Sequence, residues 1–185
     1  MISQTYVQHL DGVHTETSKL SGDSRGYFIK MESLTSMSNG IDSIAVSFNP
    51  LIGTIRGFHF QFEPYAEEKI VTCLQGAILD VLLDLRPDSS TYGSWTTLEL
   101  NDTNRLSVYL PKGIAHGFQT TEIDTHVQYC LGAAYSPEHA VTINPFGIED
   151  LDWPIKTHVV SDKDLQGISF LEGAKLYRSS IERPV

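Results

Sequence analysis

One short segment of the chain gathers residue types suited to proton transfer and anion binding. It reads Gly-Thr-Ile-Arg-Gly-Phe-His-Phe-Gln over residues 53–61, and Lys69 follows shortly after. In a strand, alternate side chains share a face, so we expect His59 and Gln61 on one face and Arg56 on the other. Directing polar groups into a barrel interior is costly unless that interior holds water or a ligand. The combination therefore predicts a site for a polar ligand, although each residue alone would fit an ordinary hydrogen-bonded core position.

A second group of residues can supply an acid to the same site. The turn Pro-x-Gly-x-x-His over residues 111–116 delivers His116 to the start of a strand, and Tyr129 and Tyr135 follow it. A phenol can act as a general acid, because it carries a proton and has an ordinary pKa of about 10. The alternative for both tyrosines is interior packing with a satisfied hydroxyl group.

A metal site is the weaker interpretation of these residues. Metal-binding proteins of the cupin class usually carry His-x-His on one strand, whereas here the second position is Gln61. His59 and His116 alone do not complete a metal site. The carboxylates that could add a ligand are Glu63, Glu67 and Glu68. We therefore expect a site without a metal.

The elements that must position these residues are short strands. Helical periodicity is scarce, and apolar or alternating runs are separated by Gly, Pro, Asn and Asp. Many short strands at this spacing are typical of a β sandwich or barrel. Ser161 and the acidic residues after it can begin a short helix. No repeat or linker divides the chain, so we expect one all-β domain over residues 1–185. The runs that we interpret as strands are 43–48, 68–74, 77–85, 95–100, 107–110, 117–121 and 126–131.

Composition excludes several classes of protein. The chain has 13 basic and 23 acidic residues and a net charge of −10, which disfavours nucleic acid as a partner. No apolar run approaches the roughly 20 residues that span a bilayer, and the N-terminus lacks a signal-peptide pattern. We therefore expect a cytoplasmic protein without a membrane partner. In that compartment Cys73 and Cys130 are expected to be free core thiols.

In order and spacing, these segments resemble the dTDP-4-dehydrorhamnose 3,5-epimerase family. The resemblance covers roughly residues 20 to 165 of the chain. The motifs that carry it are Asp23-x-Arg25-Gly26-x-Phe28, Gly53-x-x-Arg56-Gly57-x-His59-x-Gln61, Lys69-x-Val71, Asp80-Val-x-x-Asp84-Leu-Arg86, Ser89-x-Thr91-Tyr92-Gly93, Pro111-x-Gly113-x-Ala115-His116-Gly117-Phe118, Tyr129-x5-Tyr135-x-Pro137 and Asp152-Trp153-Pro154.

The resemblance implies a cupin-type jelly-roll barrel with a few short peripheral helices, a homodimer, and no cofactor or metal. It assigns His59 as the base, Tyr129 as the opposing acid and Lys69 as the group that stabilises an enolate. By resemblance, Arg25 and Arg56 would hold the diphosphate, and Tyr135 and His116 would line the sugar pocket. Gln61 and Asn144 complete the predicted set of substrate-binding residues. The implied activity belongs to deoxysugar biosynthesis for surface polysaccharides such as the O-antigen of lipopolysaccharide.

The chemistry of the residues agrees with this assignment. A ketone at C4 of a hexose acidifies the protons on C3 and C5, and returning a removed proton to the other face inverts the centre. The reaction needs a base, an opposing acid and a cation near the C4 oxygen, which are the roles of His59, Tyr129 and Lys69. Arginine forks suit diphosphate oxygens. We therefore expect epimerisation of a nucleoside-diphosphate 4-keto-6-deoxyhexose at C3, and possibly at C5.

One departure from the family pattern concerns the base. Asn144 stands where we expect an aspartate that pairs with the catalytic histidine. An amide can orient an imidazole but cannot stabilise imidazolium by charge, so we expect inversion at C5 to be slow or absent. Glu149 or Asp150 could fold back to take the place of the missing carboxylate.

Another departure concerns the nucleotide. The family's polar run Gln-x-Asn-x-Ser-x-Ser, which helps to read thymine, is replaced by residues 44–50, Ile-Ala-Val-Ser-Phe-Asn-Pro, and Lys30 replaces a glutamate. A site that has lost its polar readers should discriminate against that base. We therefore expect a dTDP or CDP sugar, with GDP also possible and dTDP not preferred.

Two other functions fit parts of the pattern. A sugar-nucleotide 3,4-ketoisomerase also moves protons next to a ketone on a cupin scaffold, but the combination of His59, Lys69 and Tyr129 disfavours it. A non-catalytic sugar-binding cupin is favoured only by Asn144. Deuterium exchange from solvent into the sugar distinguishes an enzyme from a binder.

Overall fold

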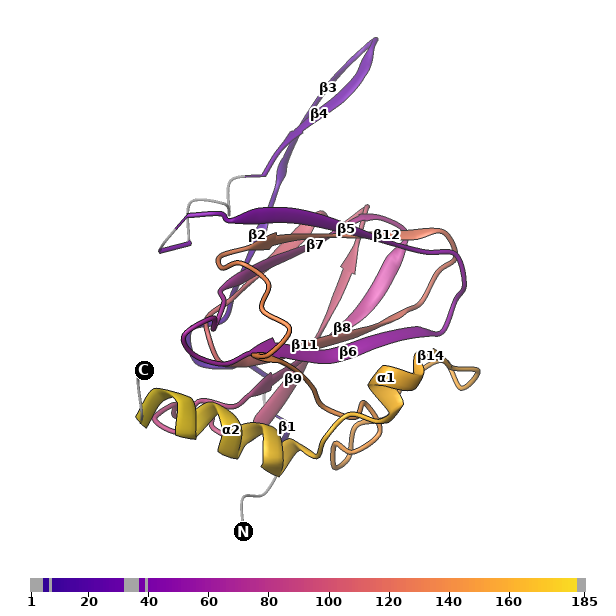
Figure 1. Ribbon diagram of the computed structural model, residues 1–185. Coiled ribbons are helices and arrows are strands. Elements are labelled where there is room, and N and C mark those ends of the chain that lie inside the picture. Colours follow the sequence, from indigo (N-terminus) through magenta and orange to yellow (C-terminus); the bar gives the residue numbers. More distant parts are fainter. Residues whose placement is uncertain (1–4, 7, 32–36, 39, 183–185) are drawn as a thin grey trace.

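The computed structural model describes residues 5, 6, 8–31, 37, 38 and 40–182. Strands make up most of the regular secondary structure, and they form two facing sheets and a separate two-stranded sheet (Figure 1). The strands are β1 (Thr5–Tyr6), β2 (His14–Thr17), β3 (Lys19–Asp23), β4 (Gly26–Lys30), β5 (Ser43–Asn49), β6 (Thr54–Gln61), β7 (Lys69–Gln75), β8 (Ala77–Asp84), β9 (Ser94–Asn101), β10 (Leu106–Leu110), β11 (Ile114–Thr120), β12 (Thr125–Leu131), β13 (Ala140–Thr142) and β14 (Val159–Val160), and the helices are α1 (Asp162–Leu165) and α2 (Phe170–Glu182).

The two facing sheets form a cupin-type jelly roll. The larger sheet has the order β1-β9-β8-β11-β6-β13, with β14 also paired to β6, and the smaller has the order β2-β10-β7-β12-β5. Buried side chains such as Val71, Leu82, Val108 and Phe118 fill the space between the sheets. The predicted all-β barrel with short peripheral helices is confirmed.

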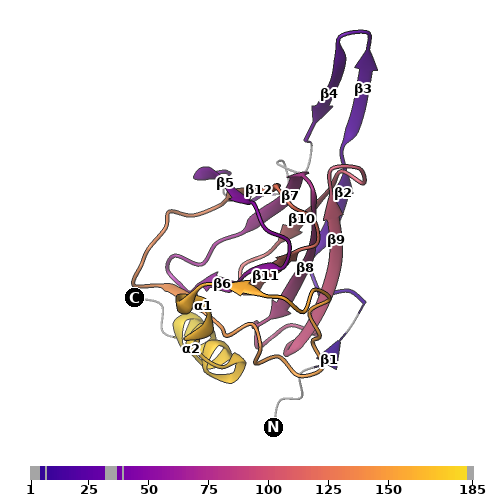
Figure 2. The same cartoon turned by 90° about the vertical axis from the view of Figure 1, so that its right-hand side faces the viewer.

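Helix α2 covers the outer face of the larger sheet (Figure 2). Its apolar residues Phe170, Ala174 and Tyr177 recur at helical spacing and pack into a cluster with Phe60 and Trp153. Sequence analysis did not predict this helix, although that spacing was available as a signal. The short helix α1 does begin after Ser161, whose side chain accepts a hydrogen bond from the backbone of Asp164 as predicted.

A β-bulge in β6 changes which side chains face the barrel. The pairing of β11 with β6 shifts register between His116 and Phe118, opposite Gly57. Ile55 therefore lies in the same outer cluster as Phe58, while Arg56 reaches Asn49 of the opposite sheet. The prediction that Arg56 and His59 lie on opposite faces of the strand is wrong, because strict alternation does not continue through the bulge.

The outer face of the smaller sheet carries exposed apolar side chains. Ile44, Val46 and Phe48 of β5 are more than half exposed. The β3–β4 hairpin projects beyond this sheet, and its Tyr27 and Phe28 are 73% and 69% exposed (Figure 1). No described element covers this face as α2 covers the other.

The described cysteines agree with the prediction of free thiols. Cys73 and Cys130 are both buried and unpaired, and burial raises the pKa of the Cys73 thiol to about 12. Among the described helices, none has the length and apolar character needed to cross a membrane.

Candidate active site

A cavity of about 260 Å³ opens between the two sheets and is lined by the three predicted catalytic residues. His59 comes from β6 of the larger sheet, whereas Lys69 of β7 and Tyr129 of β12 come from the smaller one. The base and the acid therefore lie on opposite walls, which the predicted proton transfer requires. The other residues of the lining are Ala45, Phe60, Gln61, Glu67, Leu131, Tyr135, Ala140, Val141, Thr142 and Lys163.

His59 is paired with a carboxylate that the sequence analysis did not identify. Nε2 of His59 on β6 lies 2.7 Å from Oδ1 of Asp164 on α1. The side chain of Asp164 is 6% exposed. Burial acts to raise the pKa of Asp164. The hydrogen bond and charge of His59 and hydrogen bonds from Gly57 and Ser161 outweigh burial and hold that pKa below its usual range. The carboxylate thus remains charged and can stabilise imidazolium.

The prediction that Asn144 stands in for the aspartate beside the histidine is wrong. The Asn144 side chain donates to the backbone oxygen of Leu165 at 2.6 Å and accepts from the backbone N–H of Phe146 at 2.8 Å. The Asn144 side chain therefore links the end of β13 to α1, and the carboxylate that contacts His59 is that of Asp164. The residue types after Ser161 predict only the start of a helix, because a contact with His59 across 105 residues leaves no local pattern in the sequence.

Tyr129 is set up to hold its proton. Burial raises its pKa to about 12, together with the charges of Asp80 and Cys73, while Ser47 and Arg56 act in the opposite direction. Its hydroxyl group lies 3.3 Å from Oγ of Ser47 on β5. At neutral pH the phenol is protonated, as a general acid must be.

His116 comes from β11 of the larger sheet, where it pairs with His59 of β6, and it is buried and not among the residues that line the cavity. Its predicted contact with the sugar stays a prediction. Its Nε2 is 2.6 Å from Oδ1 of the fully buried Asp80, and its ring meets that of Tyr129 edge-on at 6.1 Å. Burial raises the pKa of Asp80, while the charge and hydrogen bond of His116 oppose that rise. This second His–Asp pair supports the position of Tyr129 from the barrel interior.

Gln61 lines the cavity, but its amide is occupied by the backbone. The amide nitrogen donates to the oxygens of Tyr65 and Ala134, and the amide oxygen accepts from the N–H of Ser136 at 2.7 Å. These bonds flank Tyr135, which is 68% exposed at the edge of the cavity. The structure therefore favours a role in holding the Tyr135 loop over the predicted contact with substrate.

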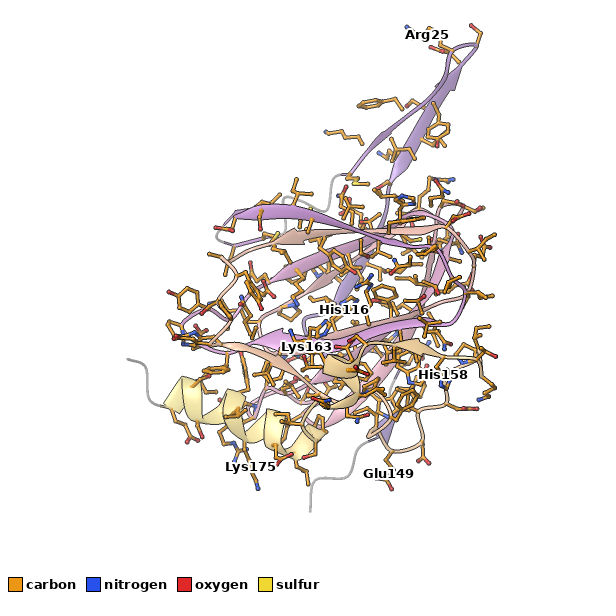
Figure 3. All side chains as sticks on the ribbon, turned by 45° about the vertical axis from the view of Figure 1, so that its right-hand side comes forward. Arg25, His116, Glu149, His158, Lys163 and Lys175 are labelled. Atoms are coloured by element: carbon orange, nitrogen blue, oxygen red, sulfur yellow. The ribbon has the colours of Figure 1, made fainter. Side chains whose placement is uncertain are left out.

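The two predicted diphosphate-binding arginines are not brought together within one chain. Arg25 lies at the tip of the β3–β4 hairpin, far from His116 in the barrel (Figure 3), and its side chain is 88% exposed and paired with Asp23. Arg56 donates to Asn49 at 2.7 Å. Neither arginine is part of the cavity lining.

Two charged residues of the lining were not predicted as substrate-site residues. Lys163 precedes Asp164 on α1, and Glu67 forms an ion pair with Lys69 at 2.9 Å. The described residues contain no group of three or more His, Cys, Asp or Glu side chains that could hold a metal ion.

A jelly-roll barrel with a His–Asp pair on one wall of its cavity and a tyrosine and a lysine on the other has the groups that a sugar epimerase acting by proton transfer requires. Residues 7–172 match the model of the family described as dTDP-4-dehydrorhamnose 3,5-epimerase. The chain is similar to the dTDP-4-dehydrorhamnose 3,5-epimerase of Sinorhizobium fredii, with 37% identity over 166 residues, 82% of this chain and 81% of the relative.

Solved structures agree with the sequence comparison. The chain is similar to the Bacillus anthracis dTDP-4-dehydrorhamnose 3,5-epimerase solved with TDP and pyrophosphate (TM-score 0.81, 34% identity, 85% of this chain and 94% of that one). It is also similar to the Legionella pneumophila enzyme in complex with dTDP-4-keto-L-rhamnose (TM-score 0.83, 28% identity, 94% and 95% coverage). The chain belongs to the dTDP-4-dehydrorhamnose 3,5-epimerase family and is an isomerase.

Proposed function

We propose that this protein epimerises a nucleoside-diphosphate 4-keto-6-deoxyhexose at C3 and C5 in deoxysugar biosynthesis, supplying surface polysaccharides. The observation that carries the proposal is the single cavity that His59, Lys69 and Tyr129 line from opposite walls. The expectation that C5 is inverted slowly depended on Asn144, and Asp164 removes its basis. Asp164 also removes the support for a non-catalytic sugar-binding protein.

The residues divide the proton transfer among them. His59 takes the proton from C3 or C5, and the electron pair of the C–H bond moves to the C4 oxygen as an enolate. The ammonium group of Lys69 stabilises that oxygen. Tyr129 then donates its proton to carbon from the opposite wall, and the carbonyl re-forms with the centre inverted. His59 then releases the abstracted proton to solvent, and Tyr129 regains a proton from solvent. In D2O the Tyr129 hydroxyl therefore carries deuterium, so each inversion places deuterium on carbon.

The test is incubation with a 4-keto-6-deoxy sugar nucleotide in D2O, followed by NMR. We expect deuterium at both C3 and C5, and His59→Asn should lower the exchange rate about a hundredfold or more while the circular dichroism spectrum stays unchanged. Exchange at the wild-type rate in that variant would place the base elsewhere. A product with its ketone at C3 would instead identify a ketoisomerase.

We propose dTDP as the carrier, supported by the relatives that are named for dTDP substrates or were solved with them. CDP stays the second candidate, because residues 44–50 lack the polar run that helps to read thymine. The test is the value of kcat/KM for matched dTDP, CDP and GDP sugars. The highest value for the dTDP sugar is expected, and a higher value for the CDP sugar would support the altered base site.

We also propose that the active form is a homodimer. An isolated two-stranded hairpin is marginally stable in water, yet this one exposes Leu20, Tyr27 and Phe28. It continues the uncovered apolar face of β5, and the combined patch fits a second copy of the chain better than solvent. A second copy would also bring the otherwise distant Arg25 to a diphosphate bound at the other active site.

The absence of a cofactor or metal requirement stays a prediction. His59 and His116 each contact a separate carboxylate, Asp164 and Asp80. We expect activity to survive exhaustive dialysis against EDTA. Loss of activity that one added metal restores would contradict this prediction. The cytoplasmic location is likewise a proposal, with which the two free buried thiols agree.

A further inference from the structure

The cavity contains a carboxylate in direct contact with the lysine assigned to the enolate. Oε1 of Glu67 lies 2.9 Å from Nζ of Lys69, and the two side chains are 9% and 10% exposed. Both residues line the cavity. They lie two residues apart where the chain enters β7, so they point to the same side. Glu68 points the other way, where it accepts hydrogen bonds from Ser38 and Tyr109.

A buried ammonium group is costly without a partner of opposite charge. A carboxylate within about 4 Å favours the charged form and offsets the loss of water. The other titratable groups that face Lys69 across the cavity are His59 of β6, Tyr129 of β12 and Lys163 of α1. Among these groups, Lys163 adds positive charge, and an ionised His59 would do the same. Glu67 is the one carboxylate among the described residues that line the cavity.

We propose that Glu67 is a positioning residue that keeps Lys69 protonated and holds its ammonium group toward the C4 oxygen of the substrate. This inference rests on the proposed function only in the identity of that oxygen. If Lys69 lost its proton, it could no longer stabilise the oxygen of the enolate by charge.

The first test is the pH dependence of deuterium exchange in Glu67→Gln. The amide keeps the size of the side chain and an oxygen for Lys69, but it removes the charge. We expect the alkaline limb of kcat/KM to move to lower pH by about one unit, which corresponds to an approximately tenfold lower rate on that limb. Tyr129, with a pKa of about 12, ionises too high to produce this shift. An unchanged limb in a folded variant would overturn the proposal.

The matched control is Glu63→Gln, which removes one negative charge outside the cavity. Glu63 contacts Lys112 at 3.1 Å, and both side chains are partly exposed. We expect this variant to keep the wild-type pH profile. An equal shift in both variants would show a general effect of net charge and would contradict a specific role for Glu67.

A second measurement does not depend on turnover. Protein labelled with ¹³C at the lysine ε carbons is titrated by NMR, and Lys69→Met identifies the Lys69 signal. The pH at which Lys69 loses its proton should fall by about one unit in Glu67→Gln and stay constant in Glu63→Gln. Equal midpoints in wild type and Glu67→Gln would refute the inference. A wild-type protein that exchanges no deuterium would instead refute the proposed function, while this titration would still decide the role of Glu67.

Discussion

At the scale of single residues, the proposed base, His59, has a partner that lies far from it in the sequence. Asp164 contacts His59 at 2.7 Å across a separation of 105 residues. Its charge stabilises imidazolium each time His59 takes a proton, so both proton abstractions should benefit equally. This arrangement resembles the orienting role of the aspartate in serine hydrolase triads, although the base here attacks a C–H bond.

Asp164→Asn should lower the deuterium exchange rate by roughly ten- to hundredfold, because a stabilisation worth one to two pKa units is lost. Asn144→Ala should keep the rate within a few-fold of wild type and lower the free energy of unfolding by about 1 kcal/mol, through loss of its two backbone hydrogen bonds. NMR exchange assays and urea denaturation measure these effects. The opposite ranking of the two variants would return the orienting role to Asn144.

The same substitution has a defined pH signature. The pKa of Asp164 is lower in the folded protein than in the unfolded chain. Its contribution to stability is therefore present above the unfolded pKa of about 4 and is lost as the pH falls through the folded value. The stability of wild type should fall more steeply than that of Asp164→Asn as the pH decreases below about 4. Parallel curves from denaturation at several pH values would exclude this linkage.

At the scale of elements, the bulge in β6 determines which residues face the cavity. Gly57 adopts a φ of +120°, and a Cβ atom there would lie 2.5 Å from Cα of Gly117 and 2.7 Å from the oxygen of His116. The close approach of β6 and β11 therefore depends on glycine at this position. His59 follows the bulge directly on β6 and lines the cavity, so the bulge also affects the position of this side chain.

Gly57→Ala should destabilise the fold by about 2 kcal/mol or more, because backbone atoms must move to admit the methyl group. The exchange rate should also fall as His59 is displaced. Gly147→Ala is the control, since its φ is not positive and its added methyl would meet the oxygen of Asn144 at 3.5 Å, an ordinary contact. Thermal melting and exchange rates of both variants give the comparison. A wild-type melting temperature in Gly57→Ala would contradict this explanation.

At the scale of the whole molecule, the two sheets are covered unequally. Helix α2 buries the outer face of the larger sheet, whereas the outer face of the smaller one carries Phe48 at 51% exposure and leads to the projecting hairpin (Figure 1). A second copy of the chain would bury both the face and the hairpin and complete the set of basic residues around each cavity.

Phe28→Asp should shift the protein from dimer toward monomer in sedimentation velocity, because a charge in an apolar interface is left without a partner. Leu171→Asp is the control, since Leu171 is 45% exposed on α2, which covers the other sheet. A wild-type protein that sediments as a monomer would exclude the dimer.

Arg25→Gln should raise KM more than it lowers kcat in steady-state kinetics, as loss of a binding contact does.

The sequence by itself predicted most of the β fold and three residues that the structure brings together in one cavity. Alternating runs and the breakers between them locate the central strands, because side-chain alternation and turn chemistry are local properties. His59, Lys69 and Tyr129 belong to motifs whose residue types state their chemistry. Helix α2 was missed although its apolar spacing was present.

Only the tertiary structure decided which groups meet. The pairing of His59 with Asp164 and of His116 with Asp80 depends on strands and a helix that approach from distant parts of the chain. For the same reason, the sequence suggested Asn144 as the partner of His59, whereas the structure shows Asp164 in that place. No local sequence pattern records a contact between residues so far apart. Burial, which raises the pKa of Tyr129, also arises only when the two sheets close around it. Residue types therefore indicate the reaction, while packing assigns each residue its partner.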